Sequence, residues 1–245
     1  PELSRGLGDV YKRQGLNKGI KLLSEINIWL CVILLSFIIL AGPTMVILSS
    51  LVSGTFDYFT TLIPLSVWVD PSEEKSWQTA WTLFYWGWWI SWGPFVGMFM
   101  ARISRGRTIR EYVMGTLLFP VLIGFVWLIV FGATALDLQL NGPGGLVEAV
   151  NKDITQAIFT AYELLNIEWA TWIISLLTTI LIASWFVTSS DSATLIICTI
   201  LCVGEKNPPQ LLRIFWGVVI GLVAGLLLLY GGLGALQIAS TSIAI

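Results

Sequence analysis

Twenty-five residues without a single charge, YVMGTLLFPVLIGFVWLIVFGATAL, run from Tyr112 to Leu136. A helix needs roughly 20 consecutive apolar residues to cross a bilayer core of about 30 Å, so this stretch by itself indicates a membrane-spanning helix. Residues 26–56, 76–101 and 214–245 also contain no Asp, Glu, Lys or Arg. The whole chain is 56% hydrophobic and 11% charged, whereas an ordinary soluble domain has about 25% charged residues. The sequence therefore predicts an all-α, polytopic membrane protein.

The two ends of the chain differ from the rest. Residues 1–14, PELSRGLGDVYKRQ, look like translated sequencing adapter, and we expect them to be an artefactual leader. Residues 15–25 are predicted to be an amphipathic helix in the membrane interface, with a plain cytoplasmic connector as the alternative. The chain has no initiator methionine and Ile245 falls inside an apolar run. We therefore expect a fragment that is cut at both ends.

The remaining part, 26–245, is predicted to be the membrane-spanning part of the chain. Gly42-Pro43 is expected to kink its first span, and the segment 148–165 is mildly amphipathic and is expected to form a helix outside the bilayer. A glycine turn at Gly231–Gly234 is expected to precede a truncated last span. The predicted spans cover residues 26–50, 78–100, 111–136, 169–203, 211–230 and 235–245.

The basic residues predict the orientation of these spans, because short cytoplasmic loops are enriched in Lys and Arg. Beyond the leader, only Lys75 and Lys152 fall on one side of the predicted membrane. The other eight fall on the opposite side and are Lys18, Lys21, Arg102, Arg105, Arg107, Arg110, Lys206 and Arg213. The loop 101–110 is therefore predicted to be cytoplasmic. Its arginines are expected to fix topology or to contact anionic lipid. We expect a multi-pass protein of a bacterial inner or plasma membrane.

The most unusual segment is the second span, WTLFYWGWWISWGPFVGMF, which runs from Trp81 to Phe99. Five of the chain's 13 tryptophans lie between residues 81 and 92. At 100° per residue, six aromatic side chains fall within about 40° of one line along this helix. Trp89 is next to that stripe. The stripe consists of Trp81, Tyr85, Trp88, Trp92, Phe95 and Phe99.

Interfacial belts and helix packing are alternative explanations for these aromatic residues. A belt suits Trp81 near the outer end, but not Trp88, Trp89 and Trp92 near mid-span, and helices in lipid approach through small residues. An aromatic box instead holds a quaternary ammonium, which cannot donate a hydrogen bond. Three rings contribute about 2–5 kcal/mol, whereas micromolar binding needs about 8 kcal/mol. Further rings are therefore expected elsewhere.

The segment from Trp81 to Gly115, WTLFYWGWWISWGPFVGMFMARISRGRTIREYVMG, strongly resembles the betaine/choline/carnitine transporter family. The resemblance continues more weakly from Gly19 to about Gly232. It implies a partial leucine-transporter-type fold with inverted repeats, in which this chain holds the helix before the second repeat and most of that repeat. It also implies substrate-binding roles for the residues that match the family's aromatic pathway. These residues are Trp88, Trp89, Trp92 and Phe95, with Trp89 at the central cage.

The fourth span contains SWFVTSSDSAT, from Ser184 to Thr194. An acid within the membrane is a functional candidate, and hydroxyl and carbonyl oxygens suit sodium. The alternative is that the hydroxyls bond to their own helix and that Asp191 is solvated or bonded to an arginine. The resemblance implies that Trp185, through its carbonyl, and the hydroxyls of Thr188 and Ser189 bind sodium.

Together these features predict a secondary active transporter, a sodium-coupled symporter for osmolytes such as glycine betaine. The open alternatives are a sodium-independent carnitine or choline exchanger and an amino-acid or amine transporter of the same fold. The absence of histidine argues against an enzyme, and Cys31, Cys198 and Cys202 lack the neighbours that a metal site needs. No cofactor other than the coupling ion and no nucleic-acid partner is expected. The resemblance implies a homotrimer for the full-length protein.

Overall fold

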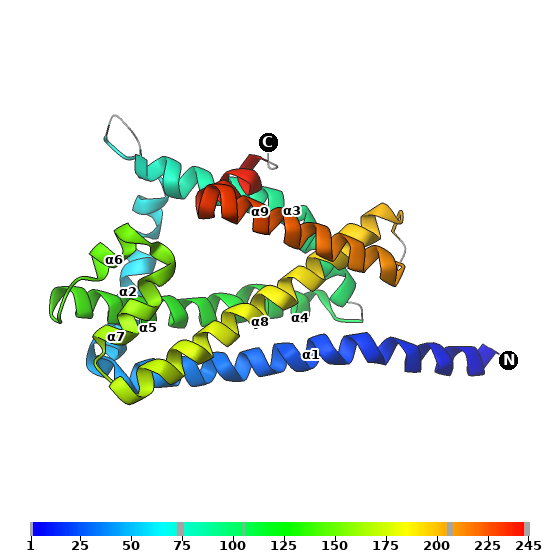
Figure 1. The fold of residues 1–245 in the computed structure, drawn as a ribbon, viewed down its shortest axis with the longest axis horizontal. Coiled ribbons are helices and arrows are strands. Elements are labelled where there is room, and N and C mark those ends of the chain that lie inside the picture. The colour runs from blue at the N-terminus through cyan, green and yellow to red at the C-terminus, as the bar shows by residue number, and fades with distance from the viewer. Residues whose placement is uncertain (1, 73–75, 105, 205–207, 243–245) are drawn as a thin grey trace. The chain divides into compact units, whose positions relative to one another are not determined.

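The computed structural model describes residues 2–72, 76–104, 106–204 and 208–242, and all regular secondary structure within these ranges is helical (Figure 1). This confirms the all-α class. The side chains of residues 2–21 lie outside the description, as do those of 103 and 241. The chain divides into two compact units, which are described in turn. Unit 1 comprises Pro1–Leu62 and Val113–Thr188, and unit 2 comprises Ile63–Tyr112 and Ser189–Ile245.

The first predicted span, 26–50, is wrong, because two helices share these residues. Helix α1 covers Glu2–Ala41 and α2 covers Thr44–Ser66. Pro43 lacks an N–H and pushes the residue before it out of the helical region, so the helix ends here and does not merely kink. A Cβ on Gly42 would lie 2.7 Å from the Ile38 carbonyl oxygen, and this break therefore requires glycine.

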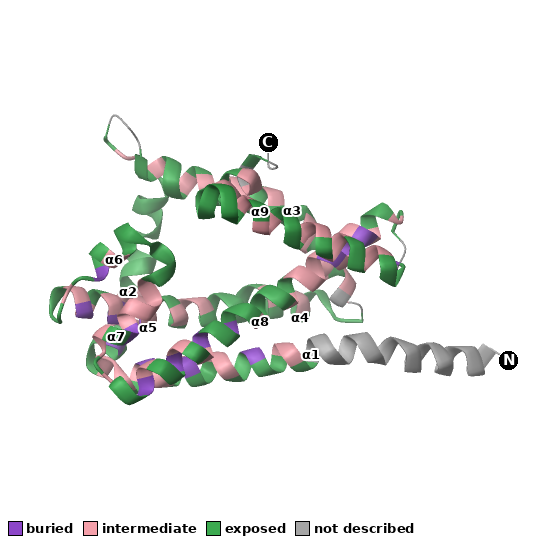
Figure 2. Cartoon of the chain, in the orientation of Figure 1, coloured by how far each residue is buried: buried purple, intermediate pink, exposed green. Residues whose placement is uncertain are grey.

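Unit 1 has a small apolar core that brings together helices far apart in the sequence. Its helices include α5 (Phe119–Leu140), α7 (Ala157–Leu164) and most of α8 (Glu168–Leu201). Figure 2 marks the buried positions in purple. The buried core residues are Leu34, Ile38, Ile47, Val130, Ala133, Tyr162, Ile174 and Leu181.

The predicted helical segment 148–165 is built from three short elements outside the candidate membrane spans. These are α6 (Leu146–Lys152), the 3₁₀ turn η3 (Ile154–Gln156) and α7. Asp153 begins η3, and its carboxylate accepts hydrogen bonds from the backbone N–H and the hydroxyl of Thr155, at 2.9 and 2.6 Å. These bonds from Thr155 stabilise the carboxylate and lower the pKa of Asp153.

Unit 2 contains the aromatic helix and its neighbour. The π-helical turn η1 (Gln78–Leu83) leads into α3 (Phe84–Ile103), and α9 (Gln210–Ser242) packs against α3. The helix α9 is interrupted at Gly232, which has φ 62° and ψ −160°. A positive φ favours glycine, and the position lies within the predicted glycine turn.

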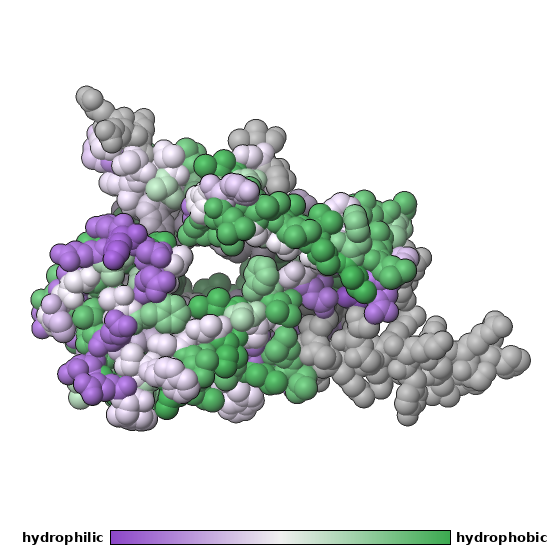
Figure 3. All heavy atoms as spheres, viewed as in Figure 1, coloured by the Kyte–Doolittle hydropathy of each residue, from purple (hydrophilic) through white to green (hydrophobic). Residues whose placement is uncertain are grey.

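Five helical segments are long and apolar enough to cross a membrane among the residues searched, namely Leu22–Ala41, Thr44–Ser66, Ile109–Leu140, Glu168–Leu201 and Gln210–Ser240. The segment 109–140 joins α4 (Ile109–Val113), the π-helical turn η2 (Met114–Leu118) and α5. Figure 3 shows hydrophobic residues over much of the helical surface. The chain is therefore a multi-pass membrane protein, as expected.

Helix α3 is not among these five segments, because the polar N–H and O–H groups of Trp and Tyr lower its hydropathy. If α1, α2 and α3 all crossed, Lys18 and the arginine loop at 101–110 would face opposite sides. The positive-inside rule disfavours that arrangement. Because α2 carries Asp57 and Pro64, we predict that α3 crosses and that α2 lies in the interface.

Candidate functional site

Aromatic side chains of η1 and α3 form a continuous row of ring contacts along one side of the helix that these two elements make. Ring centroids lie 5.9 Å apart between Trp81 and Tyr85, 6.0 Å between Tyr85 and Trp88, and 6.1 Å between Trp88 and Trp92. Trp92 continues the row to Phe95 at 6.4 Å. We call Trp81, Tyr85, Trp88, Trp92 and Phe95 the aromatic row. The predicted stripe is thus confirmed as far as Phe95.

Trp89 lies beside this row and contacts only one of its rings in the part of the chain that the structure describes. Its ring centroid is 6.3 Å from that of Trp88, and its side chain is 62% exposed. Trp92 is also exposed, whereas Trp88 and Phe95 are half-buried. The structure therefore brings the four predicted substrate residues together on one helix, with the indole of Trp89 open on its outer side.

A row of rings on one helix can supply at most one wall of a cation cage. An ammonium group held by cation–π contacts needs ring faces within about 6 Å of the charge, and aromatic cages surround their ligand with several such faces. Here neighbouring rings pack on each other, so part of each ring's surface is already covered. Trp81 and Tyr85 stack with an interplanar angle of 5°. The geometry therefore supplies a surface that can contact a cation from one side.

The predicted ion ligands lie within one turn of α8. The Thr188 hydroxyl donates a hydrogen bond to the carbonyl oxygen of Trp185 at 2.9 Å, so two of the three predicted ligand oxygens are already neighbours. Ser189 follows directly in the helix and is exposed. A hydroxyl that bonds to its own helix is also the alternative that the sequence left open. The arrangement fits both interpretations, and the sodium site stays a prediction.

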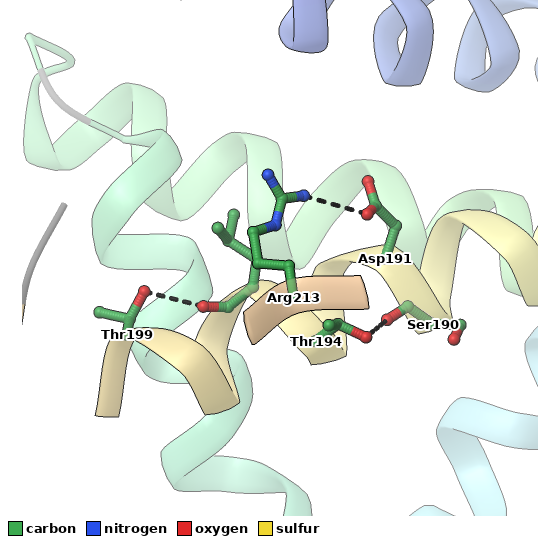
Figure 4. A network of polar contacts seen from close by, with 6 residues as sticks. Ser190, Asp191, Thr194, Thr199 and Arg213 are labelled. Carbon is green, nitrogen blue, oxygen red and sulfur yellow. Dashed lines mark hydrogen bonds and ion pairs between the residues drawn. The ribbon is translucent and has the colours of Figure 1, made fainter. Parts of the chain in front are cut away.

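Further along α8, Asp191 pairs with a cation. Its Oδ1 accepts a hydrogen bond from Nη2 of Arg213 in α9 at 3.1 Å (Figure 4). The side chain of Arg213 is 17% exposed and that of Asp191 is 37% exposed. This is the arginine contact that the sequence left open as an alternative to a functional acid.

A second arginine of unit 2 also reaches α8. Arg102 at the end of α3 donates to the Thr199 hydroxyl at 3.1 Å, and that hydroxyl donates to the Leu195 carbonyl at 2.8 Å. The sequence predicted a helix partner for neither Arg102 nor Arg213, because nothing in their spacing shows which helix lies beside them.

Comparison with known proteins shows the family to which the chain belongs. The model of the betaine/carnitine/choline family transporter (BCCT) matches residues 10–245. This chain belongs to the betaine/carnitine/choline transporter family. The match starts inside the predicted leader 1–14, which stays a prediction. Because the family consists of transporters, membership confirms that the chain is not an enzyme.

Several bacterial relatives align with most of this chain. It is 44% identical over 226 residues to the ectoine/hydroxyectoine transporter of Virgibacillus pantothenticus, covering 92% of this chain and 44% of the relative. It is 40% identical over 225 residues to the glycine betaine transporter OpuD of Bacillus subtilis, covering 91% and 43%. It is 40% identical over 229 residues to the ectoine/glycine betaine/proline transporter EctP of Corynebacterium glutamicum, covering 91% and 37%. The chain thus spans less than half the length of these relatives.

Proposed function

We propose that this chain is part of a secondary active transporter that takes up a quaternary-ammonium osmolyte such as glycine betaine, coupled to sodium. The aromatic row with Trp89 carries the proposal, because indole faces bind a cation that has no hydrogen to donate. The names of OpuD and EctP both include glycine betaine, which supports this solute class. The rest of the cage and the donors for the betaine carboxylate would come from other parts of the full-length protein.

Sodium coupling is supported by the neighbouring oxygens of Trp185 and Thr188 and by the hydroxyl of Ser189 beside them. One charge that moves through 100 mV supplies about 2.3 kcal/mol, so one or two ions drive substantial accumulation without a nucleotide. Alternating access would rock one repeat against the other around the solute. We also propose a homotrimer for the full-length protein, on family resemblance alone.

A second candidate substrate is ectoine. The relative from Virgibacillus pantothenticus, at 44% identity, is named for ectoine and hydroxyectoine. Ectoine carries a delocalised positive charge on a ring together with a carboxylate, so the same indole faces would accept it by stacking. A sodium-independent exchanger and an amine transporter are the remaining alternatives. Each of them differs in its driving ion or in its substrate.

The test is uptake of radiolabelled glycine betaine by the full-length protein in proteoliposomes with an imposed sodium gradient. We expect saturable uptake that collapses when choline-free potassium buffer replaces sodium outside. Unlabelled glycine betaine and ectoine compete in the same assay, and a primary amine such as ethanolamine does not. Uptake that persists without sodium but needs internal substrate would replace the symporter with an exchanger. Competition by ethanolamine alone would refute the aromatic cage.

A further inference from the structure

One buried polar contact in unit 1 joins α1 to α8 just before the proposed ion site. Asn27 is 4% exposed although it lies in the apolar candidate span Leu22–Ala41. Its Oδ1 accepts a hydrogen bond of 2.6 Å from the hydroxyl of Ser184, which is 157 residues away in sequence. A buried amide without a partner is costly in an apolar environment, so this bond ties the two side chains together.

Ser184 directly precedes Trp185, whose carbonyl is a proposed sodium ligand. The ring of Trp185 packs against Trp127 of α5, with centroids 5.6 Å apart and planes at 51°. Its carbonyl oxygen accepts the Thr188 hydroxyl at 2.9 Å. The turn of α8 that carries these oxygens is therefore fixed twice, by Asn27 through Ser184 and by Trp127 through the ring of Trp185.

We propose that Asn27 is a positioning residue for the coupling ion, acting through Ser184 on the backbone of Trp185; this inference rests on the proposed sodium-coupled function. A carbonyl can bind an ion only if its lone pair points into the site, and a helix carbonyl normally points along the axis to its own backbone. Outer groups that orient a ligand often decide how tightly an ion is held. The Ser184 hydroxyl also contacts the Leu181 carbonyl of its own helix at 3.0 Å, so its shorter bond to Asn27 is the contact that ties this turn to another helix.

Unit 1 also contains a comparable buried hydrogen bond that lies away from the proposed ion site. The Tyr162 hydroxyl and the Thr178 hydroxyl lie 3.0 Å apart, and both side chains are 2% exposed. This bond also joins α8 to another helix, but it lies ten residues before Thr188, nearly three turns away along α8. A bond that serves only to hold helices together would have the same consequence when removed at Thr178 as at Ser184.

The experiment measures the sodium KM and the glycine betaine KM of the full-length transporter in proteoliposomes. The variants are Ser184→Ala, Asn27→Leu and their combination, with Ser184→Thr to keep the hydroxyl and Thr178→Val as the matched control. We expect both single variants to raise the sodium KM about tenfold while the betaine KM at saturating sodium stays at the parental value. The double variant should equal the singles, and Ser184→Thr and Thr178→Val should keep the parental sodium KM.

The outcomes separate the inference from the function beneath it. Sodium-dependent uptake with a parental sodium KM in Ser184→Ala overturns the inference alone. Equal shifts in Ser184→Ala and Thr178→Val also overturn it, because they show a general structural role. A parent without sodium-dependent uptake overturns the proposed function and this inference with it. If Asn27→Leu does not accumulate in the membrane, the sodium KM of Ser184→Ala decides whether the inference holds, because that variant removes only a single oxygen.

Discussion

The aromatic row of η1 and α3 is the proposed solute surface, and the turn of α8 from Trp185 to Ser189 is the proposed ion site. The two differ in how other helices hold them. Within the described residues, the ring-to-ring contacts of the aromatic row stay within η1 and α3, and Trp89 is 62% exposed. The turn at Trp185 is held by α1 through Asn27 and by α5 through Trp127. A solute surface must stay open to admit and release its ligand, whereas ion ligands must be oriented before the ion arrives. The Trp89 and Thr188 variants each test one side of this contrast.

The largest effect is expected at Trp89. Trp89→Ala removes the ring that faces outward beside the aromatic row, and each cation–π contact contributes about 0.5–2 kcal/mol. We expect the glycine betaine KM of the full-length transporter to rise by up to about 30-fold, measured by uptake at saturating sodium. Trp86→Ala is the matched control, because Trp86 lies on the same helix and is similarly exposed at 66%. An equal effect of both variants would contradict a specific site.

The second effect concerns the ion. Thr188→Val removes a proposed ligand oxygen but keeps the shape of the side chain, so we expect the sodium KM to rise about tenfold or more. Thr179→Val is the control, because the Thr179 hydroxyl also bonds to its own helix, at the Ser175 carbonyl. A parental sodium KM in Thr188→Val would mean that this hydroxyl serves only its helix, as the alternative interpretation holds.

The third prediction tests whether Asp191 binds the coupling ion or serves only as the ionic partner of Arg213. Asp191→Asn leaves the guanidinium of Arg213 without its ionic partner, and for a partly buried pair we expect a loss of about 1–3 kcal/mol of stability. Thermal unfolding in detergent measures this loss. The combination with Arg213→Gln should recover part of it. A large rise in sodium KM at unchanged stability would instead move Asp191 into the site.

The smallest effect lies outside the membrane, at Asp153. Hydrogen bonds from Thr155 lower the pKa of Asp153 below its ordinary value of 3.8. The stabilisation is therefore fully present above pH 3.8 and is lost as the pH falls through the lowered pKa. The difference in melting temperature between the parent and Asp153→Asn should shrink over that interval. A difference that stays constant with pH would show that the charge contributes nothing.

The comparison also shows where prediction from the sequence succeeded and failed. Helical periodicity placed the aromatic residues on one stripe, because contacts between residues three and four apart are set by the helix itself. The break between α1 and α2 was misjudged as a kink. A Gly-Pro pair inside an apolar run fits either outcome until the backbone is seen. An arginine partner for Asp191 was one of the alternatives that the sequence left open, and the identity of that partner depends on how α9 lies against α8.

The sequence by itself determined that this protein is helical, lies in a membrane and presents a row of aromatic rings, because composition and local spacing fix these properties. Family membership follows from the same local patterns. Only the tertiary structure decided that Asn27 bonds to Ser184, that Trp127 packs on Trp185 and that Arg213 pairs with Asp191. These contacts join residues 22 to 157 positions apart. No periodicity encodes such pairs, since they depend on which helix faces come together when the chain packs.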